Sequence, residues 1–207
     1  MGNVCQLSNW LFKVKLQNGM TILTHGADPP PPKPLTALPA AAARAPICQS
    51  ANPNGNYGVL VVIAAPYDVT PNMSDAKLRG LIGTMDGVLY SSAVESGSAS
   101  GADYVFACNS SGDILIDHET LPTPASGANF STIVSDLWAK GYNNPNQKYA
   151  IWYDDGGRFA QSSGYCGQGS IQSDETASAS NLNDSGPSYS ITYDDDVYNC
   201  GYWTIMH

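Results

Sequence analysis

Hydrophobic and polar residues alternate along residues 11–24, close to the start of the chain. Apolar side chains fall on one side of an extended strand and lysines on the other, with Phe12, Val14 and Leu16 opposite Lys13 and Lys15. Asn18-Gly19 then offers the positive φ angles of a tight hairpin turn. The pattern predicts a β-hairpin within residues 1–28, either a trailing piece of an upstream domain or part of a propeptide.

Residues 29–46 are rich in proline and alanine and read PPPPKPLTALPAAAARAP. Such a composition forms an extended linker and cannot build a packed core. We therefore expect the main domain to span residues 47–207.

Strand-like and helix-like patterns alternate through this domain. Residues 58–65 form a continuous apolar run, of the kind that is buried on both faces of a parallel sheet. Shorter strand patterns follow at residues 103–108, 148–154 and 188–193. After a turn at residues 109–112, we expect residues 113–119 to fold back as the hairpin partner of 103–108.

Two helices are predicted between these strands. Ser74 is a suitable N-cap for the first, whose apolar residues follow three- and four-residue spacing: Leu78, Leu81, Ile82, Met85, Val88 and Leu89. Asn129 caps the second and Gly141 ends it, around one apolar stripe made of Phe130, Ile133, Val134, Leu137 and Trp138. This alternation predicts an α/β fold with a mostly parallel sheet and right-handed crossovers.

Charge and composition argue against some classes of partner and favour one location for the protein. Nine basic and eighteen acidic residues give a net charge of −9, which argues against nucleic acid and anionic membranes as partners. No apolar run approaches the length of a transmembrane helix. Only 13% of the residues are charged, which favours an extracellular protein. The first residues lack the apolar core of a secretory signal, so we expect the natural start to lie elsewhere.

The five cysteines are far apart and form no CxxC motif, which argues against a zinc ribbon or a thioredoxin-like site. Four of them, Cys48, Cys108, Cys166 and Cys200, follow the proline-rich stretch. Four cysteines allow three connectivities, of which we favour Cys48–Cys108 with Cys166–Cys200. Free buried thiols are the alternative.

The other polar candidates are ordinary surface residues in our interpretation. His25 and His118 are expected at the surface or at a sheet edge. Asp154-Asp155 and Asp194–Asp196 are expected to be solvated acidic turns, because their spacing matches no known calcium loop. Calcium binding is the less favoured alternative for these carboxylates.

The chain ends on CGYWTIMH, an apolar run typical of the first turns of a helix, with His207 as the last residue. WTIMH resembles the approach to the HExxH helix of the zincins. Upstream, GVLVVIAAPYD, ADYVFAC, NPNQKYAIWYDD, YCGQG and GPSYSITY follow in an order similar to that of metzincin-like, reprolysin-like secreted bacterial metallopeptidases. The resemblance covers residues 47–207 and includes only the first letter of the zinc motif.

This resemblance implies roles for several residues. His207 would be the first zinc ligand, while the general-base Glu, the second His and the third ligand would follow it. An antiparallel edge strand at Gly167, Gln168, Gly169 and Ser170 would pair with an extended peptide substrate. An ordinary glycine-rich loop held by Cys166 is the alternative. A Cys166–Cys200 disulfide would tie the edge strand to the start of the zinc helix.

Two functions follow from these observations. The first is the N-terminal part of a secreted zinc-dependent endopeptidase, inactive as this fragment because one histidine cannot hold catalytic zinc. The alternative is a non-catalytic extracellular module that binds carbohydrate or protein. Its support is the abundance of polar loops and of tyrosines, including Tyr153, Tyr165, Tyr193 and Tyr198.

Overall fold

The computed structural model describes residues 4–6, 12–15, 21–24, 48–49, 58–98, 103–159, 166–170 and 187–193. The chain divides into two compact units, residues 1–40 and 41–207. The first contains an antiparallel sheet of β1 (Val4–Gln6), β2 (Phe12–Lys15) and β3 (Thr21–Thr24), in that order. The pairing of β2 with β3 confirms the predicted hairpin. The proline-rich residues 29–46 lie outside the described residues.

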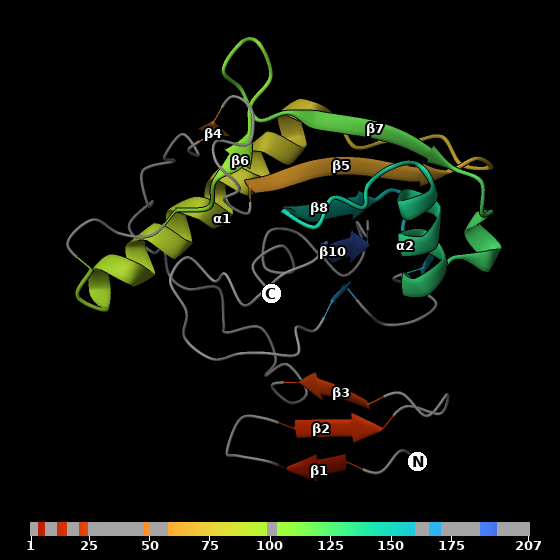
Figure 1. The fold of residues 1–207 in the computed structure, drawn as a ribbon, viewed down its shortest axis with the longest axis horizontal. Coiled ribbons are helices and arrows are strands. Elements are labelled where there is room, and N and C mark those ends of the chain that lie inside the picture. Colours follow the sequence, from red (N-terminus) through yellow and green to blue (C-terminus); the bar gives the residue numbers. More distant parts are fainter. Residues whose placement is uncertain are drawn as a thin grey trace. The chain divides into compact units, whose positions relative to one another are not determined.

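The second unit is built on a seven-stranded sheet (Figure 1). Its strands are β4 (Cys48–Gln49), β5 (Gly58–Pro66), β6 (Phe106–Ala107), β7 (Ile116–Leu121), β8 (Gln147–Tyr153), β9 (Gly167–Gly169) and β10 (Ser188–Tyr193). Their order is β4-β6-β5-β8-β10-β9, and β7 also pairs with β5. Every pairing between these strands is parallel except that of β9 with β10. The predicted α/β fold with a mostly parallel sheet and an antiparallel edge strand is confirmed.

Strand β5 is central because its apolar run supplies both faces of the sheet. It pairs with β8 along one side, and with β6 and then β7 along the other. Residues 61–66 are all buried. Successive side chains of a strand point to opposite faces, so Val61 and Ile63 face one layer while Val62 and Ala64 face the other.

Each face of the sheet is covered by one helix. On the first face, α1 (Asp75–Glu95) packs Leu78, Ile82 and Met85 against Val61, Ile63 and Trp152. On the second, α2 (Phe130–Ala139) packs Ile133 and Leu137 against Val62, Ile151 and Tyr153. We call these the α1 face and the α2 face.

The predicted helix caps are confirmed. Ser74 accepts a hydrogen bond from the backbone N–H of Lys77, which starts α1. Asn129 and Thr132 form a reciprocal capping box that starts α2. Gly141 follows α2 with φ of 99°, the left-handed conformation that ends a helix.

Two expectations were wrong. Residues 109–113 do turn, and Cys108 bridges Ile114 in antiparallel fashion, but β7 then runs parallel to β5 instead of back along 103–108. The parallel path buries Ile116 and Leu121, and the two residues of β6 offer too short a partner. Trp138 is 51% exposed because the buried face of α2 is limited to Ile133 and Leu137.

Candidate functional site

The predicted edge strand β9 pairs with β10 in antiparallel register. Gly169 lies opposite Ser190, Gln168 opposite Ile191, and Gly167 opposite Thr192. Beyond the three-residue strand, the N–H of Ser170 donates to the carbonyl oxygen of Tyr189 at 2.8 Å. At the other end, the N–H of Tyr193 donates to the carbonyl oxygen of Cys166 at 2.9 Å.

These two hydrogen bonds decide which backbone groups face outward. In an antiparallel pair, every second residue directs its N–H and C=O toward the partner strand. Residues 166, 168 and 170 therefore face β10, while Gly167 and Gly169 point their N–H and C=O groups to the outer edge. Gly169 is exposed and Gly167 is partly exposed. Within the described ranges, β9 pairs with no strand other than β10.

The central residue of β9 is held in place by its side chain. The Tyr193 hydroxyl donates a hydrogen bond of 2.6 Å to Oε1 of Gln168. The Tyr193 ring is itself fixed, with its centroid 4.2 Å from that of Phe159 and 6.0 Å from that of Tyr153. Burial, and then the charge of Asp155, raise the pKa of Tyr193, so its hydroxyl stays protonated and remains a donor.

Both ends of β9 have further attachments. The hydroxyl oxygen of Ser170 accepts a hydrogen bond of 3.0 Å from the N–H of Tyr189. Cys166 is disulfide-bonded and packs against the core cluster on the α2 face. Its partner is not among the residues whose side chains the structure describes, so the Cys166–Cys200 pairing stays a prediction. The arrangement holds the inner side of β9 and leaves its outer backbone groups accessible at Gly169.

The sheet carries a different kind of edge at β7. On the α1 face, His118 Nε2 lies 2.8 Å from a carboxylate oxygen of Asp75. On the α2 face, Glu119 forms an ion pair of 2.8 Å with Lys140 and accepts a hydrogen bond of 2.9 Å from Tyr142. Charged side chains discourage the pairing of a further strand. The edge at β7 is thus protected, whereas the glycines of β9 offer no such protection.

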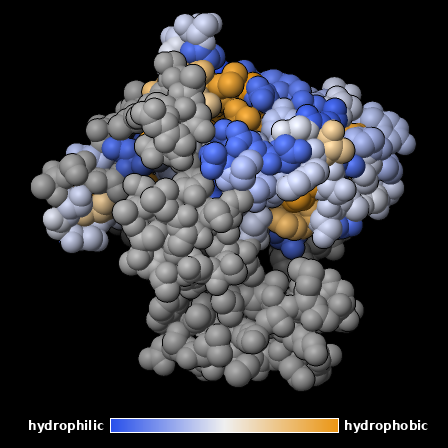
Figure 2. Space-filling model, viewed as in Figure 1, coloured by the Kyte–Doolittle hydropathy of each residue, from blue (hydrophilic) through white to orange (hydrophobic). Residues whose placement is uncertain are grey.

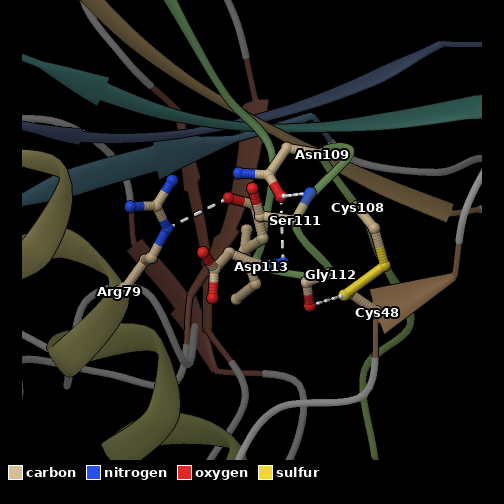
Figure 3. Close-up of a disulfide and its surroundings, with 8 residues drawn as sticks. Cys48, Arg79, Cys108, Asn109, Ser111, Gly112 and Asp113 are labelled. Atoms are coloured by element: carbon tan, nitrogen blue, oxygen red, sulfur yellow. Dashed lines mark hydrogen bonds between the residues drawn. A yellow bond between two sulfur atoms is a disulfide. The ribbon is translucent and has the colours of Figure 1, made fainter.

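The predicted Cys48–Cys108 disulfide is present (Figure 3). Cys48 lies in β4, which is at the other end of the strand order from β9. The disulfide joins β4 to the residue that follows β6. The adjoining turn is closed by Asn109, whose side-chain oxygen accepts hydrogen bonds from the N–H groups of Ser111 and Asp113. Arg79 of α1 donates to the carbonyl oxygen of Ile114 at 3.1 Å. The disulfide and these hydrogen bonds hold β4, the turn and α1 together, so we assign this corner a structural role.

The expectation that Asp154 and Asp155 form a solvated turn was wrong, since both residues are 0% exposed. Asp154 accepts hydrogen bonds of 2.7 Å from the N–H groups of Asn72 and Met73. Asp155 accepts from the N–H groups of Arg158 and Phe159 at 3.0 and 2.8 Å. The two carboxylates accept hydrogen bonds from backbone N–H groups of the loops at the carboxyl end of β8. These bonds account for the burial of both aspartates.

The electrostatics of Asp155 follow from this burial. Desolvation raises the pKa of its carboxyl, and the hydrogen bonds from the backbone together with the charge of Arg158 oppose that rise only in part. The sequence contained one usable signal for both aspartates. They directly follow a buried strand, at the end where loops of a parallel sheet gather.

The described surface offers little apolar area for a partner. On the face shown in Figure 2 it is mostly hydrophilic, with apolar side chains in small spots. The exposed large hydrophobic residues of the described ranges are Tyr67, Val94 and Trp138. Backbone groups at the β9 edge are therefore a better candidate for recognition than a hydrophobic patch.

A scan against protein-family models, a search of curated proteins and a search of solved structures each returned no match. The geometry of the β9 edge therefore carries the functional interpretation.

Several predicted site residues lie outside the described residues: His25, Asp194–Asp196, Cys200 and His207. His118 is described and its side chain is 56% exposed on β7, which confirms the predicted edge position. Within the described ranges, no three His, Cys, Asp or Glu side chains are placed to hold a metal ion. No helix in those ranges is long and apolar enough to span a membrane. Zinc binding stays a prediction, and calcium binding stays its less favoured alternative for the acidic clusters.

Proposed function

We propose that this chain is the N-terminal part of a secreted zinc-dependent endopeptidase, in which β9 takes up an extended peptide substrate by strand addition. One observation carries the proposal. Gly167 and Gly169 point their N–H and C=O groups away from β10, and the latter glycine is exposed. The segments on which the sequence resemblance rests contain β5, β6, β8, β9 and β10, and β9 has the antiparallel pairing that the resemblance implies for the edge strand.

The edge suits peptides of many sequences because it recognises backbone. Each outward residue supplies one N–H donor and one C=O acceptor, which match the groups of an extended chain. Each hydrogen bond makes a net contribution of about 1 kcal/mol to the free energy of binding, so a short ladder of them gives weak binding on its own. The bond between Tyr193 and Gln168 holds the strand in its pairing conformation before the peptide arrives. Less conformational entropy is then lost on binding.

The hydrolytic part of the proposal rests on His207 and on residues after it. When bound, zinc would supply a water of lowered pKa and would polarise the scissile carbonyl. The described residues include no group of metal ligands, so their own contribution is to bind and orient the peptide. Binding by this chain is expected without cleavage.

The binding half is tested with a synthetic extended peptide and its N-methylated forms. We expect the 207-residue chain to bind the parent peptide, as measured by fluorescence anisotropy. N-methylation of the amides that face β9 should abolish binding, whereas N-methylation of the alternate amides should not. Equal binding of all forms would contradict strand addition.

The zinc half needs the protein encoded by the complete reading frame. We expect one zinc ion per chain by mass spectrometry, together with cleavage of an unstructured protein substrate. His207→Ala should lose both, and His118→Ala, at the exposed edge of β7, should lose neither. If zinc stays bound to the His207→Ala protein, the proposed ligand is wrong. If peptides bind but are never cleaved, the non-catalytic binding module is the better interpretation.

A further inference from the structure

The side of β9 that faces α1 carries no side chains beyond hydrogen. Gln168 lies on the α2 face, because its side chain meets Tyr193 and it pairs with Ile191 of the α2-face core. Side chains alternate along a strand, so positions 167 and 169 lie on the α1 face, and both are glycine. The free edge is thus bare on one face and polar on the other.

The described residues leave space at Gly169. Among their atoms, a Cβ placed there would meet only the carbonyl oxygen of Tyr189 within 4 Å, at 3.8 Å. Its φ angle is not in the left-handed region, so the backbone does not require glycine. Neither the backbone conformation nor a clash with the described residues therefore explains why this position lacks a side chain.

The next strand inward, β10, also carries small side chains on the α1 face. Ser190 and Thr192 of β10 lie opposite Gly169 and Gly167 on the same face, and both side chains are small. They line a cavity of about 20 Å³ together with Trp152 and with Leu78 of α1. The α1 face is therefore shallow at the edge, with apolar side chains behind it.

We infer that the β9 edge selects extended peptides that carry aromatic side chains at alternate positions. This inference rests on the proposed strand addition. In a pair of strands, residues directly opposite each other place their side chains about 5 Å apart on the same face. Glycine offers no such contact, and a large aromatic side chain across the strand covers the exposed backbone instead. Two glycines in alternate positions favour two such residues.

The intervening peptide position has different requirements. Its side chain lies on the α2 face beside the amide of Gln168, which is a polar neighbour. The chain carries a net charge of −9, so its field favours basic residues there. The ligand class is therefore an extended peptide with the pattern aromatic–basic–aromatic.

The test compares three short synthetic peptides of equal charge. One alternates Phe with Lys, the second replaces each Phe by Ala, and the third has the composition of the first with the Phe residues adjacent. We expect the alternating Phe peptide to bind the full chain roughly tenfold more tightly than either of the others, as measured by fluorescence anisotropy.

Gly169→Val adds a side chain at this position and replaces glycine by a residue that favours strands. We expect the tenfold preference for Phe over Ala to fall to about threefold, because Gly167 still faces the second Phe, with the melting temperature unchanged. Thr120→Val, at an exposed position of β7, is the control and should keep the preference. If Gly169→Val keeps it as well, the inferred selectivity is wrong.

The outcomes separate this inference from the proposed function. If the Phe and Ala peptides bind wild type equally well, strand addition stands and aromatic selection fails. If neither peptide binds, both fail. Self-association of the free chain through β9, detected by sedimentation and removed by Gly169→Val, would show that a second copy occupies the edge and would overturn the peptide assignment.

Discussion

The carboxylate of Asp154 accepts a hydrogen bond of 2.7 Å from the backbone N–H of Met73. Asp154 directly follows β8, and Met73 is the residue before the N-cap of α1. The same carboxylate oxygen also accepts from the N–H of Asn72. A single buried oxygen therefore ties the end of β8 to the loop that enters α1.

Removing this oxygen should destabilise the protein strongly. Asp154→Ala would leave the two N–H groups of Asn72 and Met73 without an acceptor, one of them in a buried bond. Each unsatisfied donor costs roughly 1–3 kcal/mol, so we expect a loss of about 3 kcal/mol in the free energy of unfolding. Urea denaturation followed by tryptophan fluorescence measures the loss.

Asp154→Asn is the matched control for this prediction. Its amide oxygen can still accept both hydrogen bonds, and its NH₂ group would replace the carboxylate oxygen Oδ1, which is buried and has no hydrogen-bond partner among the described residues. Because that NH₂ group meets no described acceptor, we expect Asp154→Asn to lose about 1 kcal/mol in the free energy of unfolding, clearly less than Asp154→Ala. A loss as large as that of Asp154→Ala would show that the charge, not the acceptor, is essential.

Asp155 should make stability depend on pH in an unusual direction for an aspartate. Burial raises the pKa of its carboxyl in the folded state above the unfolded value, so the folded protein holds this proton more tightly. Its contribution to stability is then fully present below the unfolded pKa and is lost as pH rises through the folded pKa.

Comparison with Asp155→Asn isolates this effect. We expect the stability of wild type relative to Asp155→Asn to decrease as pH rises from about 3 toward neutrality, on the basis of the ordinary range of aspartate titration. Urea denaturation at several pH values measures the difference, and carboxyl NMR shifts give the pKa directly. A carboxyl of Asp155 that titrates below the ordinary aspartate range would contradict the prediction.

The Cys48–Cys108 disulfide should contribute substantially to stability. It joins residues separated by 60 positions, and a closed loop of that length restricts the unfolded chain by about 4 kcal/mol in the chain-entropy treatment. We expect Cys48→Ser/Cys108→Ser to lose an amount of this order, as measured by denaturation without reductant. Non-reducing peptide mapping supplies the check, because alkylation of Cys48 or Cys108 in the native protein is incompatible with the bond.

The elements that rest on local patterns were predictable from the sequence. The apolar run of β5, the cap at Ser74 and the capping residue Asn129 all depend on residues within a few positions of one another. The antiparallel edge strand at Gly167–Gly169 was expected from the family resemblance instead. Its outward-facing glycines follow only once the register with β10 is known.

The errors at β7 and at Asp154 concern partners that are distant in the sequence. The sequence predicts a strand at residues 113–119 but contains no information on its partner or direction, which are decided by burial of Ile116 beside Val61 of β5. Asp154 resembles a surface residue because nothing near it in sequence shows that Met73 lies beside it, 81 positions away. The structure supplied these relations through packing and backbone hydrogen bonding.

Tyr193→Phe should weaken peptide binding at β9 more than it weakens the fold. The substitution removes the 2.6 Å hydrogen bond to Gln168 and keeps the aromatic ring, which packs against Phe159. Gln168 is partly exposed, so water can replace the lost donor at a small cost in stability. Residue 168 in the middle of β9 then samples more conformations, and binding of a peptide must restrict them at a cost in affinity. We expect affinity to fall roughly threefold to tenfold.

Tyr189→Phe is the control, because it removes a hydroxyl from the same strand without touching β9. That hydroxyl donates to the carbonyl oxygen of Tyr142 at 2.5 Å in a buried bond. Its loss leaves a buried acceptor unsatisfied, which costs roughly 1–3 kcal/mol, so this variant should lose stability and keep its peptide affinity. Peptide titration and thermal denaturation of both variants provide the comparison. If Tyr189→Phe weakens binding as much as Tyr193→Phe, general loosening of β10 explains both effects, and the positioning role of Tyr193 is wrong.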